Sequence, residues 1–295
     1  MATVVERPQA EAARQLRKQL RNAERLRLTI VYSMLTVIAI AMGYPYIFTI
    51  GNALKSMGDF MVSPWSVLPQ HASFNGFVAS WTVGKVQVFL WNSFLYAAIV
   101  VVVQLVLDSM AAYAFARLRF PGRDFIFMAL MATLMIPGTV LLIPNYLIIW
   151  HMGWANTIWG IVVPGFAGIW GIFLLRQFFL NIPQELEAAA LMDGAGRFRI
   201  YWQIIVPLGK PAMIMLGVFL FIGQWSDFLW PLIVLSDWTK YPVTVGIALY
   251  QDQVSNYHWD YIFAAAVFAS APLIVLFTIA QRYIIGGIAL TGIKG

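Results

Sequence analysis

Two carboxylates interrupt long uncharged stretches of this sequence, and each has an amide side chain close before it. Gln104 precedes Asp108 by four residues and Gln224 precedes Asp227 by three, so on a helix each pair shares one face. Carboxylates and amides hydrogen-bond well to hydroxyl groups, and Trp225 offers a ring that stacks on an apolar surface. These residues predict a polar cavity between helices. The alternative explanation is packing between subunits or, for Asp227, a place near the outer interface.

The sequence offers no set of residues for bond-making catalysis. It has no cysteine, which excludes a disulfide framework, a thiolate metal site and a cysteine nucleophile. It contains no G-x-x-x-x-G-K-[ST] motif that would hold nucleotide phosphates. The three histidines share no metal-ligand spacing: His71, His151 and His258. We therefore expect no catalytic residue, no metal site and no cofactor bound by this chain.

The composition indicates what must surround these polar residues. Of 295 residues, 61% are hydrophobic and 11% are charged, whereas an average soluble domain has about 25% charged residues. A soluble fold of this size needs more charge to cover its surface. The apolar excess therefore faces lipid.

Six stretches are long enough to cross a bilayer, since a spanning helix needs about 20 largely apolar residues. The first is too long for a secretory signal and lacks a small-residue cleavage site, so we expect it to be retained. In the third, Asn145 lies with Pro137 and Pro144, and this break either contributes to a binding site or is a packing kink. The predicted spans are 28–51, 86–116, 124–149, 156–180, 210–235 and 261–284.

The placement of Lys and Arg predicts the orientation. With the N-terminus inside, all but three of the 19 bases fall on inner segments, the exceptions being Lys55, Lys85 and Lys240. Both termini are therefore expected in the cytoplasm. The net charge of +6 reflects this topology and not nucleic-acid binding, because no basic patch is interleaved with aromatic residues outside the membrane. The basic segment 1–27 is either an amphipathic helix on the inner leaflet or a disordered tail.

One inner connection, residues 181–208, is far longer than a topological loop needs. Pro183 suits the first position of a helix, and Glu185 and Glu187 lie in its first turn, where the helix dipole favours acids. We expect this helix to run to about Met192.

A turn and a second helix should complete this connection. Asp193-Gly194 is a turn pair, and Gly194 can adopt the positive φ that ends a helix. A short helix is expected over 196–206, ended by Pro207. An ordered hairpin outside the membrane indicates a docking surface for a partner.

This hairpin resembles the signature of permease subunits of binding-protein-dependent ABC importers: E-A-A, three residues, G, nine residues, I-x-L-P. Ala188 stands where the signature has Glu, with Glu187 one residue earlier, and Val206 stands where it has Leu. The matching positions are Ala189, Ala190, Gly194, Ile204 and Pro207.

Three other segments resemble carbohydrate-uptake permeases of the same family. Residues 111–123 resemble the exit of their second span, 225–231 a part of their fifth span, and 281–295 their terminal tail. The resemblance covers about 28–295 and is to the shorter permease subunit of maltose-type and glycerol-phosphate-type systems.

The resemblance implies a type I ABC importer permease in a bacterial or archaeal inner membrane. Such a chain has a transmembrane domain, 28–295, a cytoplasmic coupling loop, 181–208, and an outer loop, 236–260, that contacts the binding protein or is a simple connector. Its partners would be the lipid bilayer, a second homologous permease subunit, an extracytoplasmic binding protein and a cytoplasmic ATPase dimer that itself binds ATP and Mg. The solute would be a sugar or oligosaccharide, with glycerol 3-phosphate or another polyol as the alternative.

The resemblance implies coupling to the ATPase for Glu185, Glu187, Ala188, Ala189, Ala190, Asp193, Gly194, Ala195, Ile204 and Pro207. The polar residues of the spans themselves indicate the candidate substrate cavity, which comprises Gln104, Asp108, Asn145, Gln224, Trp225 and Asp227. A secondary transporter driven by an ion gradient is the alternative of another class, but it leaves the hairpin unexplained. An intramembrane enzyme would need a metal or nucleophile constellation.

Overall fold

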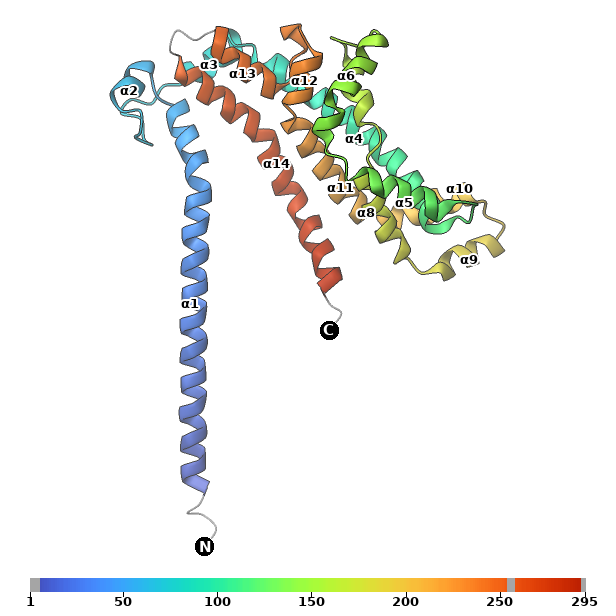
Figure 1. Ribbon diagram of the computed structural model, residues 1–295. Coiled ribbons are helices and arrows are strands. Elements are labelled where there is room, and N and C mark those ends of the chain that lie inside the picture. Colours follow the sequence, from blue (N-terminus) through green and yellow to red (C-terminus); the bar gives the residue numbers. More distant parts are fainter. Residues whose placement is uncertain (1–5, 254–257, 293–295) are drawn as a thin grey trace.

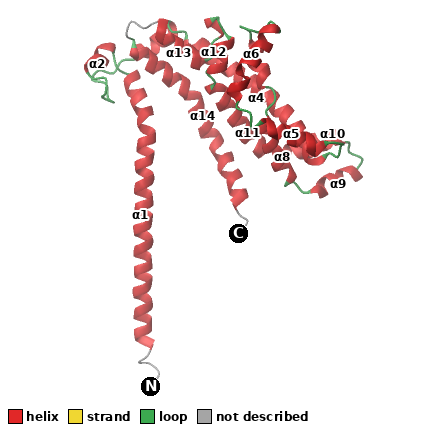
Figure 2. Ribbon diagram, in the orientation of Figure 1, coloured by secondary structure: helices red, strands yellow, loops and turns green. Residues whose placement is uncertain are grey.

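The computed structural model describes residues 6–253 and 258–292 (Figure 1). Within these ranges the chain forms helices joined by loops, without a strand (Figure 2). This confirms the predicted all-α class.

Long and short helices alternate along the chain. In order they are α1 (Glu6–Ala53), α2 (Met57–Val62), α3 (Asn75–Thr82), α4 (Val86–Arg117), α5 (Arg123–Thr133), η1 (Gly138–Leu141), α6 (Leu142–His151), α7 (Ile158–Val162), η2 (Val163–Gly165), α8 (Ile169–Leu180), α9 (Gln184–Met192), α10 (Arg197–Ile200), η3 (Tyr201–Ile205), α11 (Val206–Ser226), α12 (Leu229–Val234), η4 (Trp238–Lys240), α13 (Val243–Gln253) and α14 (Trp259–Gly292).

The described part of the chain has five candidate membrane spans and one bent pair, which makes six if the bent pair is one span, in agreement with the six predicted. The bent pair is Arg123–Thr133 with Gly138–His151, at 89°. The five spans are Leu20–Ala53, Val86–Arg117, Ile158–Leu180, Arg197–Ser226 and Trp259–Gln281.

Helix α4 is the centre of the bundle and packs against both α8 and α11 (Figure 1). The core where these three helices meet includes fully buried Leu175, Phe179, Ile205 and Leu216. Ala112 of α4 lies in the same core, and its small side chain allows close helix approach. Since lipid is as apolar as these residues, this core is stabilised by van der Waals packing and not by exclusion of water.

Helix α1 stands apart from this bundle. It is one uninterrupted helix that joins the predicted leader to the first span, so from Glu6 onward the helical alternative for 1–27 agrees with the structure, while its place on the inner leaflet stays a prediction. Its apolar window is exposed throughout, and its contacts are to α14 near one end, as Figure 1 shows. The amphipathic pattern predicted for this segment falls largely on residues 1–19, whose side chains lie outside the described ones.

Three predicted spans are broken, and each break has a local cause. In the third span one helix ends at Thr133, and the chain is helical again from Gly138, after Pro137. A proline has no N–H to donate to a helical hydrogen bond. The fourth is interrupted between Gly165 and Ile169. The fifth stops at Ser226 and does not continue to 235 as one helix.

Pro207 does not end a helix, which corrects the predicted boundary. Helices α10, η3 and α11 run on from Arg197 to Ser226 as one segment. Residues Tyr201–Ile205 form a π-helical turn, and Pro207 lies in the first turn of α11 that follows it. Proline has no N–H to donate to the preceding turn, and the helical hydrogen bonding changes from π to α just before Pro207.

Close packing at Gly209 predicts a measurable effect of one added methyl group. A Cβ at Gly209 would lie 2.6 Å from the ring of buried Phe179, whereas one at Gly223 of the same helix meets nothing within 4 Å. We expect Gly209→Ala to destabilise the chain by about 1–3 kcal/mol through overpacking. The apparent melting temperature of detergent-solubilised protein measures this, with Gly223→Ala as the matched control. Equal melting temperatures for the two variants would contradict the packing described.

Candidate coupling loop and polar clusters

The 181–208 connection forms the predicted hairpin. Helix α9 ends at Met192, as expected, but it begins at Gln184, so Pro183 is its N-cap and not its first helical residue. Gly194 has φ +78°, and its N–H donates to the Leu191 carbonyl at 3.0 Å. The Ala195 N–H donates to the Ala190 carbonyl at 2.9 Å. These bonds satisfy carbonyls that a helix end leaves unpaired, and they require the left-handed conformation that glycine adopts freely.

One face of α9 is turned outward. Met192 is 88% exposed, and Leu186, Leu191 and Phe198 are also exposed. Ala188 is exposed with them. Figure 1 shows α9 and α10 at the end of the bundle, away from α2 and α3. An exposed apolar surface of this kind is typical of an interface with another protein.

The predicted coupling residues fall on both sides of the hairpin. The outward set comprises Glu185, Ala188, Ala189, Asp193 and Gly194. The inward set packs on the bundle core and comprises Ala190, Ala195 and Ile204. Pro207 lies on α11.

Glu187 is turned into the bundle and is paired with Arg117, the last residue of α4. Arg117 Nε lies 3.0 Å from Glu187 Oε1, and the two side chains are only 3% and 8% exposed. Arg117 Nη2 also donates to the carbonyls of Phe179, at 2.6 Å, and Ile182. Cations near a helix C-terminus are favourable because they interact with the unpaired carbonyls there.

Sequence analysis did not single out Arg117. One signal was available in the sequence: Arg117 directly follows the predicted span 86–116 and is the first charged residue after Asp108. Beside it, a cleft of about 1030 Å³ separates the end of α4 from α9, and Arg119, Arg123 and Arg197 also line it.

A second polar cluster lies inside the bundle, at the break in the fourth span. Asp108 is fully buried, and its Oδ1 accepts a hydrogen bond from the Gly168 N–H at 3.0 Å. Gln104 Nε2 donates to Asp108 Oδ2 at 3.1 Å, which confirms that the two share a face. A Cβ on Gly168 or Gly171 would collide with these two side chains.

The structure adds Gln224 to this region but not the other predicted cavity residues. Gln224 Oε1 would lie 3.7 Å from a Cβ on Gly165, so it approaches the same break from α11. Trp225 is buried, stacks on Phe221 and donates its ring N–H to the Ala269 carbonyl at 3.1 Å.

The remaining two predicted cavity residues lie elsewhere. Asp227 accepts from the Trp230 N–H at 3.4 Å, at the start of α12. Asn145 is exposed on α6. The six residues therefore do not form one cavity within this chain. Among the residues described, no group of three or more His, Asp or Glu could hold a metal ion.

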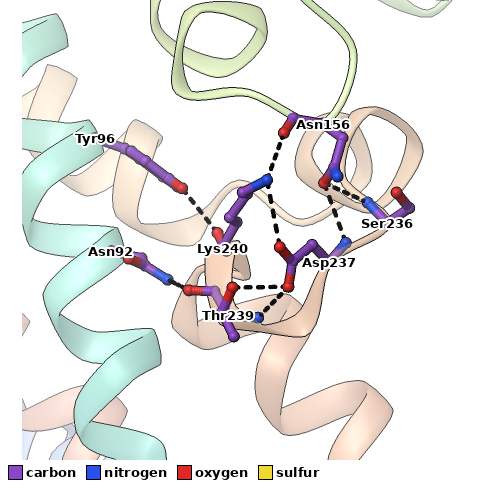
Figure 3. Close-up of polar contacts among 7 residues, drawn as sticks. All are labelled: Asn92, Tyr96, Asn156, Ser236, Asp237, Thr239 and Lys240. Carbon is purple, nitrogen blue, oxygen red and sulfur yellow. Dashed lines mark hydrogen bonds and ion pairs between the residues drawn. The ribbon is translucent and has the colours of Figure 1, made fainter.

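A third polar cluster joins the 236–241 segment to α4 (Figure 3). Asn92 Nδ2 donates to the carbonyls of Thr239, at 2.8 Å, and Tyr241, at 3.1 Å. The Tyr96 hydroxyl donates to the Lys240 carbonyl at 2.8 Å. Side chains of α4 thus hold the backbone of this loop in place.

The same loop is held from the α6–α7 connection by Asn156, which has φ +56°. Asn156 Oδ1 accepts from the N–H groups of Ser236 and Asp237, both at 3.1 Å. Lys240 Nζ donates to the Asn156 carbonyl at 3.0 Å and pairs with Asp237 at 3.3 Å (Figure 3). Asn tolerates the left-handed conformation better than most residues, which fits its place in this turn.

Residues 104–289 match the family model described as a binding-protein-dependent transport system inner membrane component. The chain belongs to this family. It is therefore a permease of an ABC importer, a transport subunit of the inner membrane.

Relatives match the permease over most of its length. It is 30% identical over 271 residues to the diacetylchitobiose uptake system permease protein NgcG of Streptomyces coelicolor, covering 91% of this chain and 89% of the relative. It is 34% identical over 262 residues to the sn-glycerol-3-phosphate transport system permease protein UgpE of Brucella abortus, covering 85% and 92%.

Solved structures show the same fold. The permease matches a chain of a bacterial ABC transporter involved in import of the acidic polysaccharide alginate, with TM-score 0.78 and 23% identity over 88% of this chain and 97% of that chain. A bacterial alginate ABC transporter in complex with an alginate pentasaccharide-bound periplasmic protein matches with TM-score 0.64 and 15% identity, over 89% and 95%. This confirms the predicted type I importer architecture.

The positive φ of Gly194 predicts that a β-branched side chain there disorders the hairpin. We expect Gly194→Val to destabilise the hairpin locally by about 1–3 kcal/mol, because this backbone conformation is strained for any residue with a Cβ. Faster proteolysis within 181–208 in detergent would show this. Gly196→Val is the matched control, since Gly196 has φ −72° and open space around it. Equal cleavage rates for both variants would contradict the assignment.

Asp237 predicts an acid-dependent stability of the 236–241 loop. Hydrogen bonds from the Thr239 hydroxyl and N–H, and then Lys240, hold the pKa of the Asp237 carboxyl below its usual range. Its contribution is therefore present above the unfolded pKa of about 3.9 and is lost as the pH falls through the lower native pKa.

We expect the apparent melting temperature of wild type to fall more steeply below about pH 4 than that of Asp237→Asn. Glu24→Gln, at an exposed carboxylate on α1, is the control and should follow wild type. Parallel pH profiles for Asp237→Asn and wild type would show that these hydrogen bonds do not favour the carboxylate.

Proposed function

We propose that this permease translocates a sugar or oligosaccharide that an extracytoplasmic binding protein delivers. The observation that supports this most is the match to the diacetylchitobiose permease over nine-tenths of the chain. An arabinooligosaccharides transport system permease of Halalkalibacterium halodurans, 28% identical over 271 residues, points to the same class of solute. Glycerol 3-phosphate is the second candidate, because the relative named for it is 34% identical.

The orientation proposed is that both termini and the 181–208 hairpin face the cytoplasm, with the 236–260 loop outside. The distribution of Lys and Arg supports this orientation. In this orientation the α9 surface would face the cytoplasmic ATPase. The Asn156 and Asp237 cluster would face the extracytoplasmic binding protein.

Energy for transport would come from a separate ATPase dimer, which would hold ATP and Mg. The exposed apolar side chains of α9 support a docking role: Met192 is 88% exposed, and Leu186 and Leu191 are 44% and 40% exposed. The exposed length of α1 supports a second permease subunit, since one chain leaves this apolar helix without a neighbour beyond α14. The permease would itself break no bond.

The docking role predicts that a charge at Met192 weakens association with the ATPase. We expect Met192→Asp to lower copurification of the ATPase about tenfold, because a carboxylate in an apolar interface must lose its hydration. Met61→Asp is the matched control, since Met61 is also exposed but lies on α2, away from α9 (Figure 1). Equal loss with both variants would refute docking at α9.

Reconstitution tests the transport class directly. The complete complex in proteoliposomes should take up solute with ATP alone and continue when ionophores abolish ion gradients, whereas a secondary transporter would stop. The solute is tested by calorimetric titration of the cognate binding protein with chitobiose-type and arabinose-type oligosaccharides and with glycerol 3-phosphate. Binding of glycerol 3-phosphate alone would replace the sugar proposal with the second candidate.

A further inference from the structure

The end of α4 is joined to α9 by a buried ion pair and not by the peptide chain. The sequence connects α9 to α8 and α10, while α4 lies far earlier in the chain. Arg117 nevertheless pairs with Glu187 at 3.0 Å, and both side chains are almost completely buried. Truncating one partner of a buried pair is strongly destabilising, because it leaves the other charge without compensation.

The same guanidinium also ties α4 to the last turn of α8. Arg117 Nη2 donates to the carbonyls of Phe179 and Ile182, which lie at the end of α8. Among the described residues, Arg117 Nε and Nη1 and Glu187 Oε1 make no hydrogen bond, so the two side chains are joined as an ion pair at 3.0 Å. In the part of the chain that is described, Glu187 is also the carboxylate that pairs with this cation. Movement of α9 therefore acts on Arg117 through Glu187.

At its other end α4 holds the outer loop by direct hydrogen bonds. Asn92 and Tyr96 donate to three carbonyls of residues 239–241. The Ser93 hydroxyl accepts from the Val243 N–H at 2.8 Å. Between the two ends, Asp108 accepts from the Gly168 N–H at the start of α8. A helix of 32 residues is about 48 Å long, so α4 bridges the hairpin and the outer loop.

We propose that the Arg117–Glu187 pair is the positioning contact that transmits movement of α9 to α4, and through α4 to the 236–241 loop. The proposal rests on the proposed function, because it needs an ATPase that moves α9. Arg117 and Glu187 act as positioning residues, since neither touches solute or nucleotide here. The pair converts docking on one side of the membrane into a displacement of the loop on the other.

A single cysteine reports the movement, because the chain has none of its own. Trp238→Cys is placed in the outer loop at a half-exposed position. Its rate of labelling with a membrane-impermeant maleimide is measured in the complete complex, without nucleotide and with ATP and vanadate. A change of rate in wild type reports the response of the outer loop to the ATPase.

We expect Glu187→Gln to keep its ATPase and its hydrolysis of ATP but to lose the labelling response about tenfold, since the uncharged amide compensates Arg117 poorly. Glu187→Asp should restore part of the response because it restores the charge. Asp124→Asn is the matched control: it breaks the exposed Arg123–Asp124 pair, 2.9 Å apart, on the same side of the bundle, and should respond as wild type does.

The outcomes separate the linkage from the function on which it rests. A full labelling response in Glu187→Gln would overturn the linkage while leaving the proposed function in place. Loss of the ATPase from Glu187→Gln would also overturn it, by showing that the pair only shapes the docking surface. A wild-type complex that binds no ATPase, or whose loop ignores ATP, would overturn the proposed function and the linkage with it.

Discussion

Backbone N–H and C=O groups inside a membrane have no water to bond with, and this constraint governs the arrangement around α4. The fourth span is broken before Ile169, which would leave the Gly168 N–H without a partner, and the Asp108 carboxylate accepts it. At the end of α8, the Phe179 carbonyl accepts a hydrogen bond from Arg117, which also belongs to α4. Charged side chains of α4 are therefore used to complete the backbone of its neighbour.

The predictions that succeeded rest on local signals in the sequence. Six spans, the helix ending at Met192 and the positive φ of Gly194 follow from local signals: apolar length, helix dipole and the freedom of glycine. The pairing of Gln104 with Asp108 follows from helical periodicity. None of these depends on knowing which helix lies next to which.

Two of the features that were not predicted from the sequence depend on tertiary neighbours, and a third depends on a local change of helix type. Trp225 was predicted to stack on an apolar surface of the solute. Its ring instead stacks on Phe221, and its N–H donates to the Ala269 carbonyl of α14. The partner of Glu187 is 70 residues earlier in the chain, and no spacing rule connects the two. Pro207 reads as a helix terminator because the π-helical turn before it, which places it in a first turn, has no clear sequence signature.

That π-helical turn has a consequence for how this region tolerates insertions and deletions. A π turn holds one residue more than the α-helical turn it replaces, so Tyr201–Ile205 carry a surplus residue in the register between the hairpin and α11. Each residue of an α-helix turns the chain by about 100°. Removing one residue from Tyr201–Ile205 would therefore restore an α-helical turn and leave the flanking segments in phase, whereas removing one from the regular first turns of α11 would turn the outward face of α9 by about 100° around the axis of α11. The direction in which the exposed face of α9 points therefore depends on the number of residues between α9 and α11 as well as on their types.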